Sequence, residues 1–188
     1  TPRLSQLENL VALRGQSCNT STKLSLQCMF VRPAAVTEQG MNQPVVSELP
    51  VFSVLKKLGF SIDVLAMQSE VWFYNSVMAD FYKIREVIAA APNNVGKPSH
   101  DGLLLDEMAE RLATKTKTPK LVILHTKGSH YLYTSRYPRS FARYQPECKG
   151  IDQRCSHAQL INSYDNSILY LDYFLTQLTT QLQDKKAL

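Results

Sequence analysis

Apolar residues along this chain occur in two patterns, short runs of strand length and longer stretches with a helical period. The short, mainly apolar runs lie at residues 10–13, 61–66 and 121–124. The run 121–124 has no polar position, as expected for a central parallel strand that is covered on both faces. Because helical stretches alternate with these runs, the sequence predicts an α/β fold with a mainly parallel sheet and flanking helices.

Three amphipathic helices are predicted, at 51–58, 101–114 and 156–183, from apolar residues repeated every three or four positions. Pro50 opens the first helix and Gly59 stops it. The apolar positions expected on the buried faces of the first two helices are Val51, Val54, Leu55 and Leu58, then Leu105, Met108, Ala109 and Leu112.

The third helix begins with a capping box, in which Ser156 and Gln159 bond to each other's backbone. Its apolar residues alternate three and four apart from Ile161 to Leu182. A coiled coil shares this spacing, but a long helix lying on the sheet is the favoured interpretation. Polar residues at 164–166 could support a site from its first half.

Two segments have a less regular pattern. Residues 31–48 are interpreted as a loop, because Pro33, Gly40 and Pro44 interrupt them. Residues 67–91 are rich in aromatic side chains, namely Trp72, Phe73, Tyr74, Phe81 and Tyr82. These rings could face lipid or a sugar–lipid acceptor, but a buried helix face under a loop is the favoured interpretation.

The composition is that of an ordinary globular domain, with 44% apolar and 20% charged residues among 188. The net charge of +5 is spread along the chain and suits an anionic membrane or lipopolysaccharide surface. No basic run or nucleic-acid motif occurs, so nucleic acid is not expected as a partner. The sequence has no run of about 18 apolar residues, so no transmembrane helix is predicted within it.

Four cysteines fall as two local pairs, Cys18 with Cys28 and Cys148 with Cys155. Neither pair has the C-x-x-C spacing of many metal or thioredoxin-type sites. Two disulfides, each closing a short loop, are the simplest prediction. They imply an oxidising compartment, which favours the periplasm over the cytoplasm.

Hydroxyl side chains gather between the first two cysteines, just before an apolar stretch. Asn19, Thr20 and Ser21 can each cap a helix that begins there. A hydroxyl on the first turn of a helix lies where free N–H groups favour an anion, so this place suits a phosphate or a forming alkoxide. On spacing alone, a capped helix held by a disulfide is the simpler interpretation.

His125 and His130 follow the apolar run 121–124, with Gly128 between them. Ligands of open α/β sheets gather at the carboxyl ends of strands, so both histidines lie where chemistry is expected. A single histidine is more often structural, but two beyond one strand are more informative.

These two segments together resemble the phosphoethanolamine transferases of the alkaline phosphatase/sulfatase superfamily. The first match is Ser-Cys-x-Thr-Ser-Thr followed by Ser-x-x-Cys-Met-Phe, over 17–30. The second is His-Thr-x-Gly-Ser-His-x-x-x-Tyr-x-x-Arg-Tyr-Pro, which continues through Cys148 and Cys155 to Asn166. Asn19 and Gln27 stand where the family usually has Gly and often has Pro.

The resemblance implies specific roles. Thr22 is expected to be the nucleophile and a metal ligand, and His130 to face the nucleophile and the phosphoryl group as a second catalytic residue. Lys127 and His125 are expected to bind substrate, with His125 orienting its neighbours. We also expect Thr22 and His130 to share one cleft at the carboxyl edge of the sheet.

The family also has parts that do not occur in these residues: membrane helices, a Gly-Glu-x-x-Arg strand end and an Asp-His-Gly-Glu segment. Residues 1–188 are therefore expected to be part of a periplasmic, sulfatase-like catalytic domain, incomplete at both ends, on the bacterial inner membrane. Zinc is implied for the parent enzyme. Of the family's metal ligands only Thr22 remains, and a catalytic zinc needs about three protein ligands, so this piece is expected to hold zinc weakly and to be inactive.

The function implied is transfer of phosphoethanolamine from phosphatidylethanolamine to lipopolysaccharide, on a Kdo sugar or on lipid A, through a phosphorylated threonine. One alternative is a phosphoglycerol transferase or a phosphatase of the same superfamily. The other is a disulfide-bonded periplasmic domain without catalytic activity.

Overall fold

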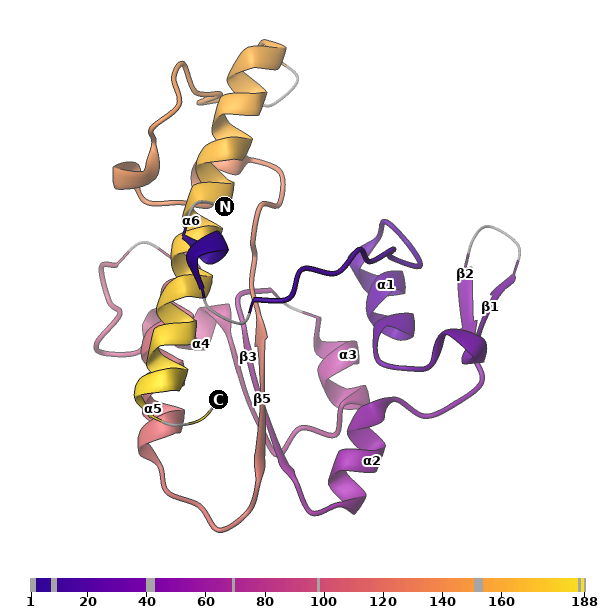
Figure 1. Cartoon of the computed structure of the whole chain (residues 1–188). Helices are drawn as coiled ribbons and strands as arrows, with labels where there is room; N and C mark the ends of the chain where they lie inside the picture. The colour runs from indigo at the N-terminus through magenta and orange to yellow at the C-terminus, as the bar shows by residue number, and fades with distance from the viewer. Residues whose placement is uncertain are drawn as a thin grey trace.

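The computed structural model describes residues 3–7, 10–39, 43–68, 70–97, 99–150, 154–185 and 187. Its main sheet has three parallel strands: β3 (Ser61–Ala66) at the centre, flanked by β4 (Phe81–Ile84) and β5 (Lys120–His125) (Figure 1). The predicted α/β fold with a parallel sheet is therefore confirmed.

The position of β5 differs from the prediction. Within the described part of the chain, β5 lies at an edge of the sheet rather than at its centre. All six residues of β5 are half-buried, whereas β3 is buried from Ile62 to Ala66. An apolar run shows that a strand is largely shielded from water, but it does not show what shields it.

Helices cover both faces of the sheet (Figure 1). One side carries α1 (Thr22–Met29), α2 (Val51–Lys57) and α3 (Val71–Ser76). The other side carries α4 (Arg85–Ala90), α5 (Leu103–Ala113) and α6 (His157–Asp184). Successive β3 residues face opposite layers. Ile62, Val64 and Ala66 pack with α1, α2 and α3, while Leu65, and Met67 just after the strand, pack with α4, α5 and α6.

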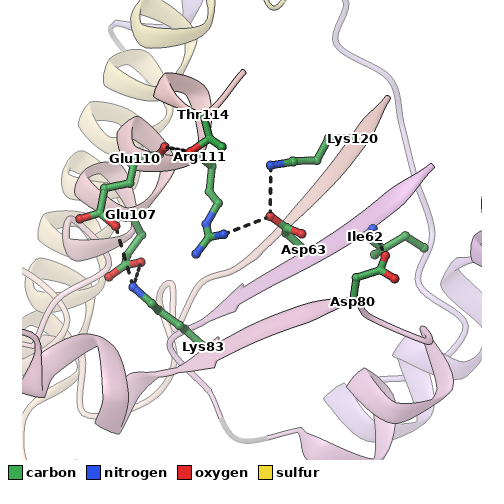
Figure 2. Close-up of polar contacts among 9 residues, drawn as sticks. All are labelled: Ile62, Asp63, Asp80, Lys83, Glu107, Glu110, Arg111, Thr114 and Lys120. Atoms are coloured by element: carbon green, nitrogen blue, oxygen red, sulfur yellow. Dashed lines mark hydrogen bonds and ion pairs between the residues drawn. The ribbon is translucent and has the colours of Figure 1, made fainter. Parts of the chain in front are cut away.

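A buried polar network ties α5 to the sheet (Figure 2). Asp63, in the central strand, lies 3.5 Å from Arg111 of α5 and 3.6 Å from Lys120 of β5. Lys83 of β4 pairs with the buried Glu107 of α5 at 2.7 Å. Carboxylates this deeply buried are stable only when they have charged or hydrogen-bonding partners, so the network aligns α5 over β3 and β4.

The long helix α6 lies over α5 and the sheet, and the predicted capping box of Ser156 and Gln159 is present. Its first half buries polar side chains rather than the expected apolar ones. Asn166 accepts hydrogen bonds from the backbone N–H groups of Arg143 and Tyr144, both at 2.9 Å. Polar residues of α6 therefore hold the long segment that follows β5, which contains η3 (Tyr133–Ser135) and η4 (Arg139–Phe141).

The N-terminal segment also docks on α6. The backbone N–H groups of Arg3 and Leu4, at the start of η1 (Leu4–Gln6), donate to the buried carboxylate of Asp172 at 3.1 and 2.9 Å. The run 10–13 that follows is not the predicted strand, and Leu10, Val11 and Leu13 are exposed. A strand needs neighbours for its N–H and C=O groups, and this run has none among the described residues.

Residues 31–48 are more regular than predicted. After η2 (Pro33–Ala35), β1 (Val36–Gln39) pairs antiparallel with β2 (Gln43–Val46). Gly40, one of the three residues taken as loop markers, lies outside the described residues. The valines at 36, 45 and 46 favour strands, and Pro44 is compatible with a strand at the edge of a two-stranded ribbon.

The first two amphipathic helices form, but their faces differ from the prediction. In α2 the buried residue is Phe52, while Val51, Val54 and Leu58 are exposed. Phe52 contacts Phe30 and Phe73, so ring packing decides which face turns inward. Gly59 ends this helix with a φ of +83°. In α5 Leu105 and Met108 are buried as predicted, but Ala109 is exposed.

Candidate functional site

Thr22 is the first residue of α1, and the loop before it is held in place by covalent and polar contacts. Asn19 accepts a hydrogen bond from the backbone N–H of Ser21 at 2.8 Å, whereas Ser21, at the N-cap position, makes no side-chain cap. The Cys18–Cys28 disulfide joins the loop to the last turn of α1. Together with the disulfide Cys148–Cys155, it confirms the predicted pairing.

A cavity of about 600 Å³ opens beside this helix end. It is lined by Thr22 and other residues of α1 and its preceding loop, by Phe73 of α3, and by Ile123, Leu124 and His125 of β5. The N-terminal end of α1 therefore lies at the carboxyl end of β5. This is the edge of the sheet where the sequence predicted the site.

The cavity unites some of the predicted site residues. Thr22 and His125 both line it, whereas His130 and Lys127 are not among its lining residues. Those two belong to the loop that leaves β5 after His125. A single cleft shared by Thr22 and His130 thus stays a prediction, and His125 is the histidine that shares a cavity with the threonine.

His125 is held by two side chains, one from α3 and one from the segment that follows β3. Its Nδ1 lies 2.6 Å from the hydroxyl of Tyr74 in α3, and its Nε2 lies 3.4 Å from the amide nitrogen of Gln68. Burial lowers the pKa of His125 below its ordinary value of 6.5, although the nearby Glu70 carboxylate opposes this shift. His125 is therefore neutral at pH 7.

The loop after β5 is fixed by Asp101. Its two carboxylate oxygens accept the backbone N–H groups of Lys127 and Gly128 at 2.7 and 2.8 Å. Burial raises the pKa of Asp101, and these two hydrogen bonds oppose the rise. Gly128 has a φ of +55°, a backbone conformation that a residue with a side chain would adopt only with strain.

Cationic side chains gather around this loop. The guanidinium of Arg136 donates to the backbone carbonyls of His130 and Tyr131 at 3.2 and 2.9 Å. Burial lowers the pKa of Lys127, and the nearby charges of Arg136 and Arg85 lower it further. Among the described residues, neither Lys127 nor Arg136 forms an ion pair with a carboxylate. The arrangement favours an anionic ligand.

Three residues of the site were not predicted from the sequence: Tyr74, Asp101 and Arg136. Tyr74 belonged to the aromatic segment 67–91. Burial of Phe73 and Tyr74 in α3 supports the favoured interpretation of a buried helix face, whereas Phe81 and Tyr82 lie in β4 and Tyr82 is exposed. The side chain of Trp72 is not among those described. Asp101 was treated as a helix start. Arg136 lies within the Arg-Tyr-Pro motif of the family resemblance, and this motif was the one sequence feature that pointed to Arg136 as a site residue.

The described residues do not by themselves fit a tetrahedral metal centre. No group of three or more His, Cys, Asp or Glu side chains in the described part of the chain could hold a metal ion. A catalytic zinc uses about three protein ligands, so Thr22 alone cannot supply the set. No helix in the described part of the chain is long and apolar enough to cross a membrane.

These features define a class of protein: an α/β domain that presents a hydroxyl at a helix N-terminus, beside a neutral histidine and a group of cations, at the carboxyl edge of a parallel sheet. Such a site suits phosphoryl transfer. The chain belongs to the sulfatase family, whose family model matches residues 1–188. The resemblance to the alkaline phosphatase/sulfatase-like phosphoethanolamine transferases is confirmed.

The chain is also similar to a curated relative with a specific name. The chain is 54% identical, over all 188 of its residues, to the Kdo(2)-lipid A phosphoethanolamine 7''-transferase of Escherichia coli K12. It spans about a third of the length of the curated relatives it matches, 33% in this case.

Two solved structures share the fold. The C-terminal periplasmic domain of phosphoethanolamine transferase EptC from Campylobacter jejuni is 26% identical with a TM-score of 0.66, over 90% of this chain and 51% of that one. The soluble domain of lipooligosaccharide phosphoethanolamine transferase A from Neisseria meningitidis is also 26% identical, with a TM-score of 0.69 over 88% and 49% of the two chains.

Proposed function

We propose that the protein containing this chain transfers phosphoethanolamine from phosphatidylethanolamine to lipopolysaccharide, on a Kdo sugar or on lipid A. The observation that carries this proposal is the 54% identity, across the whole chain, to an enzyme named for phosphoethanolamine transfer to Kdo(2)-lipid A. The cavity shared by Thr22 and His125 supplies a place for the chemistry. Phosphoglycerol transfer and a non-catalytic role are not favoured by these relatives.

The reaction has two displacements. The hydroxyl oxygen of Thr22 attacks the phosphorus of the lipid, the bond from phosphorus to the diacylglycerol oxygen breaks, and that oxygen takes up a proton as diacylglycerol leaves. A hydroxyl of the acceptor then attacks the same phosphorus, the bond from phosphorus to the Thr22 oxygen breaks, and that oxygen takes up a proton as Thr22 is released. Each step moves a proton from the attacking hydroxyl, and neutral His125 or His130 is suited to accept it.

Cations in the loop after β5 complete this proposed site. A phosphodiester carries a negative charge, and its transition state spreads that charge over the phosphoryl oxygens. The cations Lys127 and Arg136, together with the neutral imidazole of His130, would hold those oxygens or the anionic groups of the acceptor. Lys127 and His125 keep the substrate-binding role inferred from the family resemblance.

The relatives support a proposal for the cellular setting. We infer that residues 1–188 form part of a periplasmic, sulfatase-like catalytic domain of a protein on the bacterial inner membrane. The family implies zinc, which would lower the pKa of the Thr22 hydroxyl; because the described residues do not hold it, no step is assigned to it here. The chain alone is expected to turn over little or no lipid.

Replacement of Thr22 tests the proposal. In cells that lack their own copy, the intact protein with Thr22→Ala should lose phosphoethanolamine transfer by about a thousandfold or more, because the nucleophile is gone. Mass spectrometry of extracted lipopolysaccharide measures the loss. Lys23→Ala, on the exposed side of the same helix, is the matched control and should retain activity. Normal modification by a folded Thr22→Ala protein would refute the proposal.

A further inference from the structure

Helix α3 contacts both sides of the cavity. Phe73 stacks on Phe30, the residue that ends α1, with ring centroids 5.6 Å apart. The next residue, Tyr74, is 2% exposed, and its ring lies edge-on to His125 with ring centroids 5.9 Å apart. Two neighbouring side chains of one short helix therefore position the helix of Thr22 and the side chain of His125.

The hydrogen bonds around His125 define its tautomer. The side-chain amide of Gln68 donates to the backbone carbonyl of Thr126 at 3.0 Å, which fixes its nitrogen on the side of His125. An amide nitrogen is only a donor, so the His125 Nε2 facing it at 3.4 Å is suited to accept. The proton then belongs on Nδ1.

Tyr74 completes the arrangement. If Nδ1 carries the proton, it donates to the Tyr74 oxygen at 2.6 Å, and the Tyr74 hydroxyl donates to the backbone carbonyl of Gln68 at 3.3 Å. Every donor then has an acceptor among these groups. With the proton on Nε2 instead, that N–H faces a second donor. Unpaired donors in a buried site are costly, so the first tautomer is preferred.

We propose that Tyr74 is a positioning residue for His125: with Gln68, it holds the imidazole, which lines the Thr22 cavity, as the neutral Nδ1–H tautomer with Nε2 as an acceptor. Charged groups near the ring are Glu70, before α3, and Lys127, after β5. The tautomer follows from the hydrogen bonds alone. Its effect on transfer rests on the proposed function.

Nitrogen NMR of histidine-labelled intact protein tests the tautomer directly. His125 signals are assigned by their loss in His125→Gln. The wild type should show a protonated Nδ1 and an unprotonated Nε2. Tyr74→Phe keeps the ring but removes the acceptor of Nδ1–H, so the population should move toward the Nε2–H tautomer. Tyr82→Phe, at an exposed tyrosine of β4, is the matched control.

Gln68→Glu provides the opposite change. A carboxylate at this place accepts a hydrogen bond from Nε2–H and stabilises the protonated nitrogen, so Nε2 should become protonated at neutral pH. A protonated Nε2 in the wild type, or Tyr74→Phe and Gln68→Glu proteins with unchanged His125 signals, would overturn the proposal.

Turnover separates this inference from the proposed function. Tyr74→Phe should lower kcat about tenfold, the lower end of the effect of losing a partner that orients a functional histidine, with KM changed little. Unchanged kcat with the expected tautomer shift would overturn the link to catalysis. Activity that survives Thr22→Ala would refute the proposed function while the NMR result on Tyr74 still stood.

Discussion

The histidines at the carboxyl edge of the sheet share one electrostatic property. Burial is the largest cause that lowers the pKa of His100, His125 and His130 from the ordinary 6.5. All three are therefore neutral at pH 7, while Arg136, close to His100 and His130, stays charged. The edge thus combines a fixed positive charge with imidazole groups that can accept a proton, which is what a hydroxyl nucleophile and a phosphoryl group require.

The lowered pKa of His125 makes stability depend on pH. In the unfolded chain this histidine titrates near pH 6.5, whereas in the folded chain it titrates lower. As the pH falls below about 6.5, the unfolded state binds more protons, so the free energy of unfolding decreases until the folded pKa is passed. His125→Gln should reduce this decrease between pH 7.5 and about 5.5, measured by urea unfolding.

His157→Gln is the control for this measurement, because its side chain is exposed on the first turn of α6. A decrease in stability that is as steep in His125→Gln as in the wild type would show that His125 does not contribute to it.

At the scale of elements, the polar network under α5 is the contact most sensitive to a single change. Asp63→Asn removes the carboxylate that lies between Arg111 and Lys120, and leaves two cations in a half-buried setting. The free energy of unfolding should fall by about 3 kcal/mol, as for other broken buried ion pairs. Chemical denaturation measures the change.

Glu110→Gln gives the matched comparison for Asp63→Asn. Glu110 reaches Lys83 at 3.9 Å from an exposed position, so its loss should cost less than about 1 kcal/mol. Equal effects of the two substitutions would show that the buried pairs do not hold α5 on the sheet.

The elements divide into those that local pattern predicts and those that need a tertiary partner. β3 and the capping box of α6 follow from residues adjacent in the sequence. The inward face of α2 does not, because Phe52 turns inward to meet rings on α1 and α3. The pairing of β1 with β2 was not predicted, because Pro33, Gly40 and Pro44 resemble loop residues when considered singly.

The same division applies to the candidate site. Thr22 and His125 were predicted from motifs, and the structure places both on one cavity. Tyr74 and Asp101 could not be predicted, because their partners, His125 and the backbone at 127–128, are 51 and at least 26 residues away. Such partners become visible only when the strands are assembled.

At the scale of the whole molecule, the two helical layers contribute different residues to the candidate site. The layer of α1, α2 and α3 carries Thr22 and, through Tyr74, orients His125 (Figure 1). The opposite layer supplies Asp101, which anchors the loop carrying Lys127 and His130. Both contributions meet at the carboxyl end of β5, where the proposed phosphoryl transfer takes place.

The central claim is that Thr22 carries the phosphoethanolamine group between donor and acceptor. Intact protein incubated with phosphatidylethanolamine, without an acceptor, should accumulate the covalent intermediate, and peptide mass spectrometry should locate it. The account predicts the mass of one phosphoethanolamine group on Thr22, absent from Thr22→Ala protein. A phosphoglycerol group on Thr22, or phosphoethanolamine on a neighbouring hydroxyl such as Thr20 or Ser21, would contradict it.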